Sequence, residues 1–209
     1  TDYTYDVNTT NIIKLNGASI TVTGTGATVS GSTVTISAAG TYAISGNLTN
    51  GQIKVQTDAT DPVKLVLNGI DISNSSTSPI FIDKAKKAIL FLAKGTTNKV
   101  TDGATYTITT EGQNAAIYSQ TYLAIAGEGN LNVTGNFADG IGGKDGLLIN
   151  GGNITVNAKD EGIRGKDYLV VRDGNLTVTT TSCDGLKSDY YDNTKYGYVL
   201  IDKGTFKIT

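Results

Sequence analysis

Short alternations of apolar and polar residues recur along the chain, and in its second half they recur as near-copies of one phrase. Two segments match position for position: "LLINGGNITV" from Leu147 and "LVVRDGNLTV" from Leu169. A third, "YLAIAGEGNLNV" from Tyr122, has the same order of apolar and turn residues with a longer loop. An alternation with a period of two, bounded by Gly, Asn and Asp, predicts short strands joined by tight turns. The pattern therefore predicts an all-β chain built from repeats.

A second repeated phrase sets the length of the repeat. "ADGIGGKD" begins at Ala138, "DEGIRGKD" at Asp160 and "CDGLKSD" at Cys183, so an acid, a glycine and an aliphatic residue recur after 22 and then 23 residues. A period of this length made of short strands is typical of a solenoid. The lattice of leucines that leucine-rich repeats need is absent. We expect an all-β, right-handed parallel β-helix that forms a single domain over residues 1–209, with its clearest repeats at 111–209.

An antiparallel sandwich is the alternative architecture, because strands spaced 8 to 12 residues apart would suit it as well. A sandwich, however, gives no reason for near-identical phrases at a fixed spacing. In a parallel solenoid each residue lies over its counterpart in the next coil, about 4.8 Å away. Two columns are then expected, one of aliphatic residues in the interior and one of asparagines whose amides bond to each other along the stack. The aliphatic column is Ile141, Ile163 and Leu186, and the asparagine column is Asn130, Asn153 and Asn175. The repeat also accounts for the x-Thr contexts of Asn132, Asn153 and Asn175, which otherwise resemble glycosylation sequons.

One segment fits two kinds of structure. "FIDKAKKAILFLAKG" (Phe81 to Gly95) could form an amphipathic helix on propensity alone. We interpret "AILFLA" as a buried strand that follows a lysine-rich turn.

Composition excludes several classes of function. The chain of 209 residues has no His, no Trp, no Met and one Cys, with a net charge of −2. Without His, the Ser-His-Asp and Cys-His mechanisms are excluded, and one Cys without His argues against a tetrahedral zinc site. No basic run points to nucleic acid, and no apolar stretch approaches the 18 residues of a membrane span. Cys183 is expected to be a small packed residue, and Thr1 in place of Met suggests a processed or trimmed chain.

Acidic residues stack in two columns if the repeats stack in parallel. Bare carboxylates one coil apart repel by roughly 3–4 kcal/mol per pair at an effective dielectric constant near 20, so solvent or a cation must compensate them. Oxygen ligands without His favour Ca²⁺. The expected calcium ligands are Asp139, Asp160, Glu161 and Asp184, with Asp145, Asp167 and Asp189 in the second column. Turn formation by Asp-Gly is the alternative, above all in the second column, where Lys144 and Lys166 are adjacent. Glycines 140, 162 and 185 are expected to let the backbone turn sharply.

A family resemblance rests on the same residues. "DEGI", preceded one repeat earlier by "DGI", resembles the calcium motif of family-nine pectate lyases, which are right-handed β-helices. The resemblance implies that Asp160, Glu161 and Asp139 hold Ca²⁺. The family has a further Asp three places after the second acid, where this chain has Arg164, or Lys187 in the next repeat. The whole chain resembles more closely the lyase-like carbohydrate-binding β-helix proteins of cellulolytic bacteria, which are secreted, bind calcium and associate with cellulose and acidic plant polysaccharides.

Candidate sugar ligands gather in and near the longest repeat. Sugar rings are bound by aromatic faces and by charge-assisted hydrogen bonds. Tyr198 aligns with Tyr168 and is interpreted as scaffold, whereas Tyr190 and Tyr191 lie in the inserted loop. The expected carbohydrate-binding residues are Arg164, Lys166, Lys187, Tyr190 and Tyr191. The absence of Trp argues against a flat platform for crystalline cellulose.

The expected function is that of a secreted or cell-surface, calcium-binding protein. It would recognise plant cell-wall polysaccharide, either cellulose or an acidic pectin-type polymer, without cleaving it. One alternative is a calcium-dependent pectate lyase with Lys187 or Lys166 as its base. The other is a structural stalk or surface adhesin, in which the columns serve only stability.

Overall fold

The computed structural model describes residues 3–5, 8–9, 11–107, 112–192 and 194–209. Within them the chain forms twenty β-strands and no helix, and so no helix that could cross a membrane. The strands are β1 (Ile12–Gly17), β2 (Ser19–Thr23), β3 (Ala27–Ser30), β4 (Thr33–Ile36), β5 (Gly40–Leu48), β6 (Gln52–Gln56), β7 (Val63–Asn74), β8 (Ile80–Lys84), β9 (Ala88–Leu92), β10 (Thr97–Asp102), β11 (Ala115–Ser119), β12 (Leu123–Gly127), β13 (Asn130–Gly135), β14 (Asp139–Gly143), β15 (Leu147–Ala158), β16 (Ile163–Gly165), β17 (Tyr168–Thr180), β18 (Leu186–Lys187), β19 (Tyr198–Ile201) and β20 (Thr205–Ile208).

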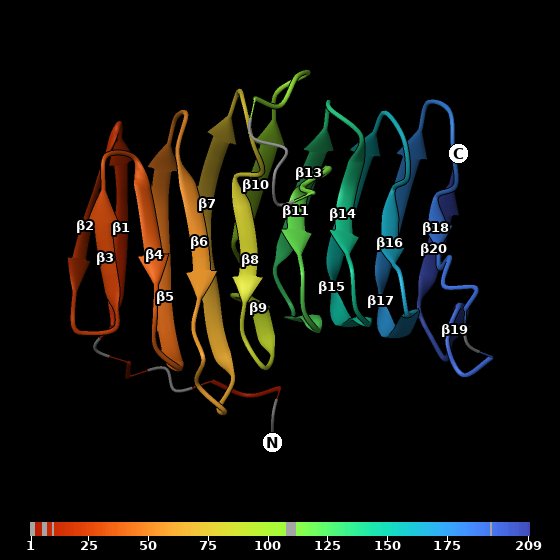
Figure 1. Ribbon diagram of the computed structural model, residues 1–209, viewed down its shortest axis with the longest axis horizontal. Coiled ribbons are helices and arrows are strands. Elements are labelled where there is room, and N and C mark those ends of the chain that lie inside the picture. The colour runs from red at the N-terminus through yellow and green to blue at the C-terminus, as the bar shows by residue number, and fades with distance from the viewer. Residues whose placement is uncertain (1–2, 6–7, 10, 108–111, 193) are drawn as a thin grey trace.

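The strands lie side by side in an elongated stack, with the first hairpins at one end and β18 to β20 at the other (Figure 1). They form two sheets, one of twelve strands and one of eight, the latter in the order β18-β16-β14-β11-β8-β6-β4-β3. Equivalent strands of successive repeats pair in parallel, with Leu147 opposite Leu169 and Asn153 opposite Asn175. The parallel alignment of the repeated phrases is therefore confirmed, and the antiparallel sandwich is excluded for this region.

The prediction of a right-handed parallel β-helix was wrong as a description of the fold. In the twelve-stranded sheet β7 pairs with both β9 and β10, and β15 pairs with both β12 and β13. Since β9 also pairs with β12 and β10 with β13, these six parallel strands close into a ring, and the eight-stranded sheet is separate from it.

The physical reason for the closure is that two long strands each serve two sets of partners. Strands β7 and β15 have twelve residues each. Near their middles lie Gly69, with φ +74°, and Gly151, with φ +116°, where the left-handed backbone that glycine tolerates can redirect a strand. At the N-terminal end, β1 with β2 and β3 with β4 form antiparallel pairs, which is a second departure from uniform coils.

The core lies between the two sheets and contains the predicted aliphatic column. Ile141 is opposite Ile163, and Ile163 is opposite Leu186. The first two are fully buried and Leu186, near the end of the stack, is half-buried. Burying an isoleucine contributes about 1.5–3 kcal/mol, so the repeated aliphatic residue ties each repeat to the core. The interpretation of "AILFLA" as a strand is also confirmed, because β9 is a strand with every residue buried.

The predicted asparagine column is confirmed as well. Asn153 Nδ2 donates to Asn130 Oδ1 over 3.1 Å, and Asn175 Nδ2 donates to Asn153 Oδ1 over 2.7 Å. These hydrogen bonds run across neighbouring strands on the outer surface. The ladder therefore holds the register of β13, β15 and β17 from outside, as the aliphatic column does from inside.

Candidate functional site

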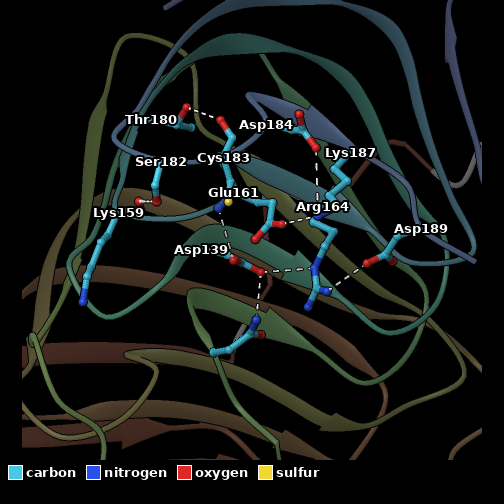
Figure 2. Close-up of polar contacts among 11 residues, drawn as sticks. Asp139, Lys159, Glu161, Arg164, Thr180, Ser182, Cys183, Asp184, Lys187 and Asp189 are labelled. Carbon is cyan, nitrogen blue, oxygen red and sulfur yellow. Dashed lines mark hydrogen bonds and ion pairs between the residues drawn. The ribbon is translucent and has the colours of Figure 1, made fainter.

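The first acidic column lies at one edge of the eight-stranded sheet (Figure 2). Asp139 begins β14, Glu161 stands two residues before β16 and Asp184 two residues before β18. Because these strands are parallel neighbours, their starts meet at the same edge. The backbone holds them there, since Gly140 N donates to the carbonyl of Glu161 over 3.0 Å and Gly162 N to that of Asp184 over 2.9 Å. The structure thus brings together the acids that the repeat placed in one column.

Two cations of the chain itself lie among these acids (Figure 2). Arg164 Nε is 3.2 Å from Asp139 Oδ2, and the Nη1 atom of the same guanidinium is 3.3 Å from Asp189 Oδ2. Lys187 Nζ donates to Glu161 Oε1 and lies 3.9 Å from Asp184 Oδ2. The column is therefore a ladder of ion pairs between repeats.

Sequence reasoning missed this pairing, although a signal for it was present. Each cation stands three residues after the acid of its own repeat: Arg164 after Glu161 and Lys187 after Asp184. Its long side chain reaches the acid of the preceding repeat, at Asp139 or Glu161.

Asp139 is the most enclosed member of the ladder. Its side chain is fully buried, its Oδ2 accepts a hydrogen bond from Asn114 Nδ2 over 2.9 Å, and its Oδ1 accepts one from the backbone N–H of Glu161 over 3.4 Å. Burial raises the pKa of Asp139 to about 7; the Glu161 carboxyl acts in the same direction and the Arg164 guanidinium against it. Burial would also raise the pKa of Glu161, but hydrogen bonds with Asp139 and Lys187 outweigh it and lower that pKa. The two carboxyls therefore favour a state in which Asp139 holds the proton.

The candidate metal ligands are divided by this arrangement. Asp160, Glu161 and Cys183 each offer a ligand atom, and the three atoms lie within 4.8 Å of one another. The two carboxylates fit a hard cation such as Ca²⁺, which takes six to eight oxygens. Asp139 does not fit, because the guanidinium of Arg164 and the amide of Asn114 already enclose its oxygen. A calcium ion here would therefore be held by Asp160 and Glu161, with further oxygens from the backbone or water.

Cys183 differs from its prediction as a packed residue. It is exposed, because it lies in the last turn of the stack, where no further repeat covers it in the described chain. A hydrogen bond with Asp160 raises the pKa of its thiol, and burial contributes less. The protonated thiol is a poor metal ligand, since the thiolate is the ligating form.

The second acidic column is brought together only in part. Burial raises the pKa of Asp167, and the carboxylate of Asp145 in the preceding repeat raises it further, so these two acids are neighbours. Asp145 Oδ1 also accepts a hydrogen bond from the backbone N–H of Gly146 over 2.7 Å, which is a turn contact. Asp189 does not join them and instead pairs with Arg164 in the first column.

The predicted sugar ligands are in varied surroundings. Arg164 and Lys187 are held in the ion pairs described above. The Lys166 ammonium lies 5.7 Å from the ring centroid of Tyr190, and that ring meets the ring of Tyr196 edge-on. Tyr191 is 88% exposed. A ligand in solvent can therefore reach Tyr191.

Comparisons with known proteins give a consistent assignment. A solved structure described as that of the polysaccharide lyase-like protein from C. thermocellum, gadolinium derivative, has a TM-score of 0.91 and 36% identity over 96% of this chain and 82% of that one. A carbohydrate-binding domain-containing protein of Acetivibrio thermocellus is 41% identical over 126 residues, which are 59% of this chain and 44% of that relative. The matched segment thus spans less than half of the relative. The model of the carbohydrate-binding domain-containing proteins matches residues 30–209, so the chain belongs to this family.

Proposed function

We propose that this protein is a secreted or cell-surface module that binds plant cell-wall polysaccharide without cleaving it. Family membership supports a carbohydrate ligand, and the name of the solved neighbour, a polysaccharide lyase-like protein, supports a polymeric one. Cellulose and acidic pectin-type polymers are the proposed ligands. The observation that carries the absence of cleavage is the ion pair between Lys187 and Glu161.

A pectate lyase needs a neutral base that removes a proton from the sugar ring beside the uronate carboxylate. Lys187 is unsuited to this task, because its hydrogen bond to Glu161 raises the pKa of the ammonium and keeps it charged. Lys166, the other candidate base, has its nitrogen 5.7 Å from the ring centroid of Tyr190, so it already contacts a side chain of the protein itself. The lyase alternative is therefore disfavoured chiefly by the ion pair at Lys187.

Binding and cleavage can be measured together. The protein is passed over immobilised cellulose, pectate and xylan, with calcium or with a chelator, and the eluate is monitored for unsaturated products by ultraviolet absorbance. We expect retention on at least one polymer and no rise in absorbance. A rise that Lys187→Ala abolishes would establish the lyase instead, and retention on none of the polymers would favour the structural stalk.

The calcium site is a further part of the proposal, with Asp160 and Glu161 as its ligands. The cluster has five carboxyls (Asp139, Asp160, Glu161, Asp184 and Asp189) and two cations (Arg164 and Lys187), so negative charge is in excess even if Asp139 is protonated. Gadolinium, present in the solved neighbour, is like calcium a hard cation that binds oxygen. Lys187 shares Glu161 and would compete with the ion.

Calcium binding makes a prediction about melting temperature. Because an ion that binds only the folded state stabilises it, a chelator should lower the melting temperature, and Asp160→Asn should abolish most of this difference. Lys187→Gln should lower the calcium concentration at which half of the stabilisation is reached, since it removes the competing ammonium. Asp71→Asn, at an exposed acid paired with Lys99 on the other sheet, is the control. If the melting temperature of the wild type is the same with chelator, the acids are turn residues and the calcium proposal fails.

A further inference from the structure

A second cluster of apolar side chains lies outside the core, on the outer face of the twelve-stranded sheet. Its buried members come from β7, β9, β12, β15 and β17, or directly follow β9: Val66, Ile89, Phe91, Ala93, Ala124, Ala126, Leu148 and Val170. The N-terminal segment covers one end of it, where the ring of Tyr5 lies 5.1 Å from that of Phe91. Toward the C-terminal end a groove of about 450 Å³ opens over Leu148 and Val170. That volume is within the range of ligand-binding pockets.

One wall of the groove is a row of tyrosines. The same position of three repeats, just before the first paired apolar residue of the strand, holds a tyrosine: Tyr122, Tyr168 and Tyr198. Tyr168 is directly opposite Tyr198. The rings of Tyr168 and Tyr198 are stacked with centroids 5.5 Å apart and planes at 13°, and those of Tyr122 and Tyr168 are 6.5 Å apart. Because the faces of these rings pack against each other, the row presents ring edges and hydroxyl groups to the groove.

A glycine makes the row continuous. The repeat between Tyr122 and Tyr168 has Gly146 at the equivalent position. A Cβ atom on Gly146 would lie 2.1 Å from Cζ of Tyr168, so the tyrosine ring lies where a side chain would otherwise be. From Tyr122 to Tyr198 the row crosses three strand spacings, roughly 14 Å at 4.8 Å each, which is longer than one sugar ring.

The remaining lining of the groove is polar and planar. Tyr3 contributes a further ring, whose hydroxyl lies 3.4 Å from that of Tyr122, and Asn150 and Arg172 contribute an amide and a guanidinium. Arg172 Nη1 is 2.5 Å from Asp202 Oδ2, but the arginine side chain is 56% exposed. Exposed ion pairs contribute about 0–1 kcal/mol, so the guanidinium can exchange this partner for a ligand oxygen at little cost. Guanidinium groups bind both hydroxyl and carboxylate oxygens, and carboxylates in a bidentate manner.

We infer that this groove binds the polysaccharide, as an extended pyranose chain that crosses the strands along the tyrosine row. The inference rests on the proposed function and identifies its site. A pyranose has apolar ring faces and a rim of hydroxyls, which match the aliphatic floor of Leu148 and Val170 and the polar groups of the tyrosines and Arg172. The same groove accepts neutral or uronate rings, and Arg172 favours uronates.

This places the site on the twelve-stranded sheet, whereas the ion-pair ladder lies on the eight-stranded sheet and Tyr191 lies in the loop between β18 and β19. In the groove, Tyr198 is 43% exposed and Arg172 is 56% exposed, whereas Arg164 bridges two acids and Lys187 is bound to Glu161. Recruiting Arg164 or Lys187 to a ligand would expose the charges that they compensate. The groove therefore binds a ligand at a lower cost to the fold.

The test compares variants of the two surfaces on the polymer that the wild type binds, with cellulose and pectate distinguishing neutral from uronate chains. Tyr198→Ala changes a side chain that is 43% exposed, so folding should persist, and melting curves verify it. We expect Tyr198→Ala to weaken binding about tenfold and Tyr198→Ala with Arg172→Ala to weaken it further. Thr177→Ala, on the outer face of the sheet beyond the groove, should bind as the wild type does.

The outcomes separate the two proposals. If the wild type binds no polysaccharide, the proposed function fails and the groove assignment fails with it. If the wild type binds and folded Tyr198→Ala and the double variant bind equally well, the function stands and the groove is not the site. Loss of binding in Tyr191→Ala without loss in Tyr198→Ala would likewise overturn the groove and assign binding to the loop.

Discussion

Replacing Arg164 with alanine is expected to lower the free energy of unfolding by about 3–5 kcal/mol above about pH 7, where Asp139 is ionised, since this is the range for removing one partner of a buried ion pair. The reason is the position of Asp139, which is fully buried and has the Arg164 guanidinium 3.2 Å away. Without this cation, a carboxylate that cannot be hydrated would have to take up a proton or remain charged in the interior. Asp189 would lose the same partner.

Chemical denaturation measures this loss, and a second arginine provides the control. Arg172 also pairs with an aspartate, but its side chain is 56% exposed, so Arg172→Ala should cost no more than about 1 kcal/mol. The combination of Arg164→Met with Asp139→Asn should be less damaging than Arg164→Ala alone, because neither member of the pair remains as a buried charge. If Arg164→Ala lowers the free energy of unfolding no more than Arg172→Ala does, the carboxylate of Asp139 is accessible to water and does not depend on Arg164.

The pH dependence of stability, in the wild type and in Arg164→Ala, follows from the direction in which the pKa of Asp139 is shifted. The pKa of Asp139 is raised in the folded protein, so between the ordinary carboxyl range and about pH 7 the folded state holds a proton that the unfolded state has lost. Stability from this group therefore falls as the pH rises through that interval. The Arg164 guanidinium holds the pKa of Asp139 down, so Arg164→Ala should extend this fall to higher pH and make its total larger, and Asp139→Asn should remove it.

Much of the strand pairing could be predicted because, in a parallel stack of repeats, residues that pair occupy equivalent positions of the repeated sequence. When "LLINGGNITV" and "LVVRDGNLTV" match position for position, each residue and its partner one strand away are known. The aliphatic and asparagine columns follow directly. The closure of six strands into a ring could not be predicted, since it depends on how far β7 and β15 bend at their glycines, and a glycine in a strand does not specify the angle of a bend.

The burial of residues at the end of the stack could not be predicted from the repeat either. Cys183 has the same place in its repeat as Asp160, and Leu186 the same as Ile163. Cys183 is nevertheless exposed and Leu186 only half-buried, because no further described repeat packs on them. The tyrosine row illustrates a different limit. The sequence predicts that Tyr198 aligns with Tyr168, and the two are indeed opposite one another. Whether such a column packs against the fold or lines a groove depends on how far the neighbouring side chains project from the sheet, which the alignment does not give.

The repeated glycines also had a different role from the expected one. Within the described chain none of Gly140, Gly162 and Gly185 has a positive φ, so the sharp turn predicted for them is not the reason for glycine. The reason is lack of space. A Cβ atom on Gly162 would lie 2.2 Å from Val178 Cγ1 and 2.6 Å from the carbonyl oxygen of Gly185 in the next repeat. The glycine lets successive backbones and the core approach closely, which fixes the acid beside it.

Gly162→Ala should therefore destabilise the protein by about 1–3 kcal/mol, the usual cost of forcing an extra carbon into a packed core. Gly185→Ala is the matched control, because its Cβ would meet only side-chain atoms, chiefly Ile208 Cγ2 at 2.3 Å, and Ile208 is 46% exposed and can move. Thermal or denaturant unfolding should show a clearly smaller loss for Gly185→Ala, since a backbone carbonyl yields less readily than a side chain at the end of the stack. Equal losses would show that the backbone carbonyl of the neighbouring repeat is not what excludes a side chain at Gly162.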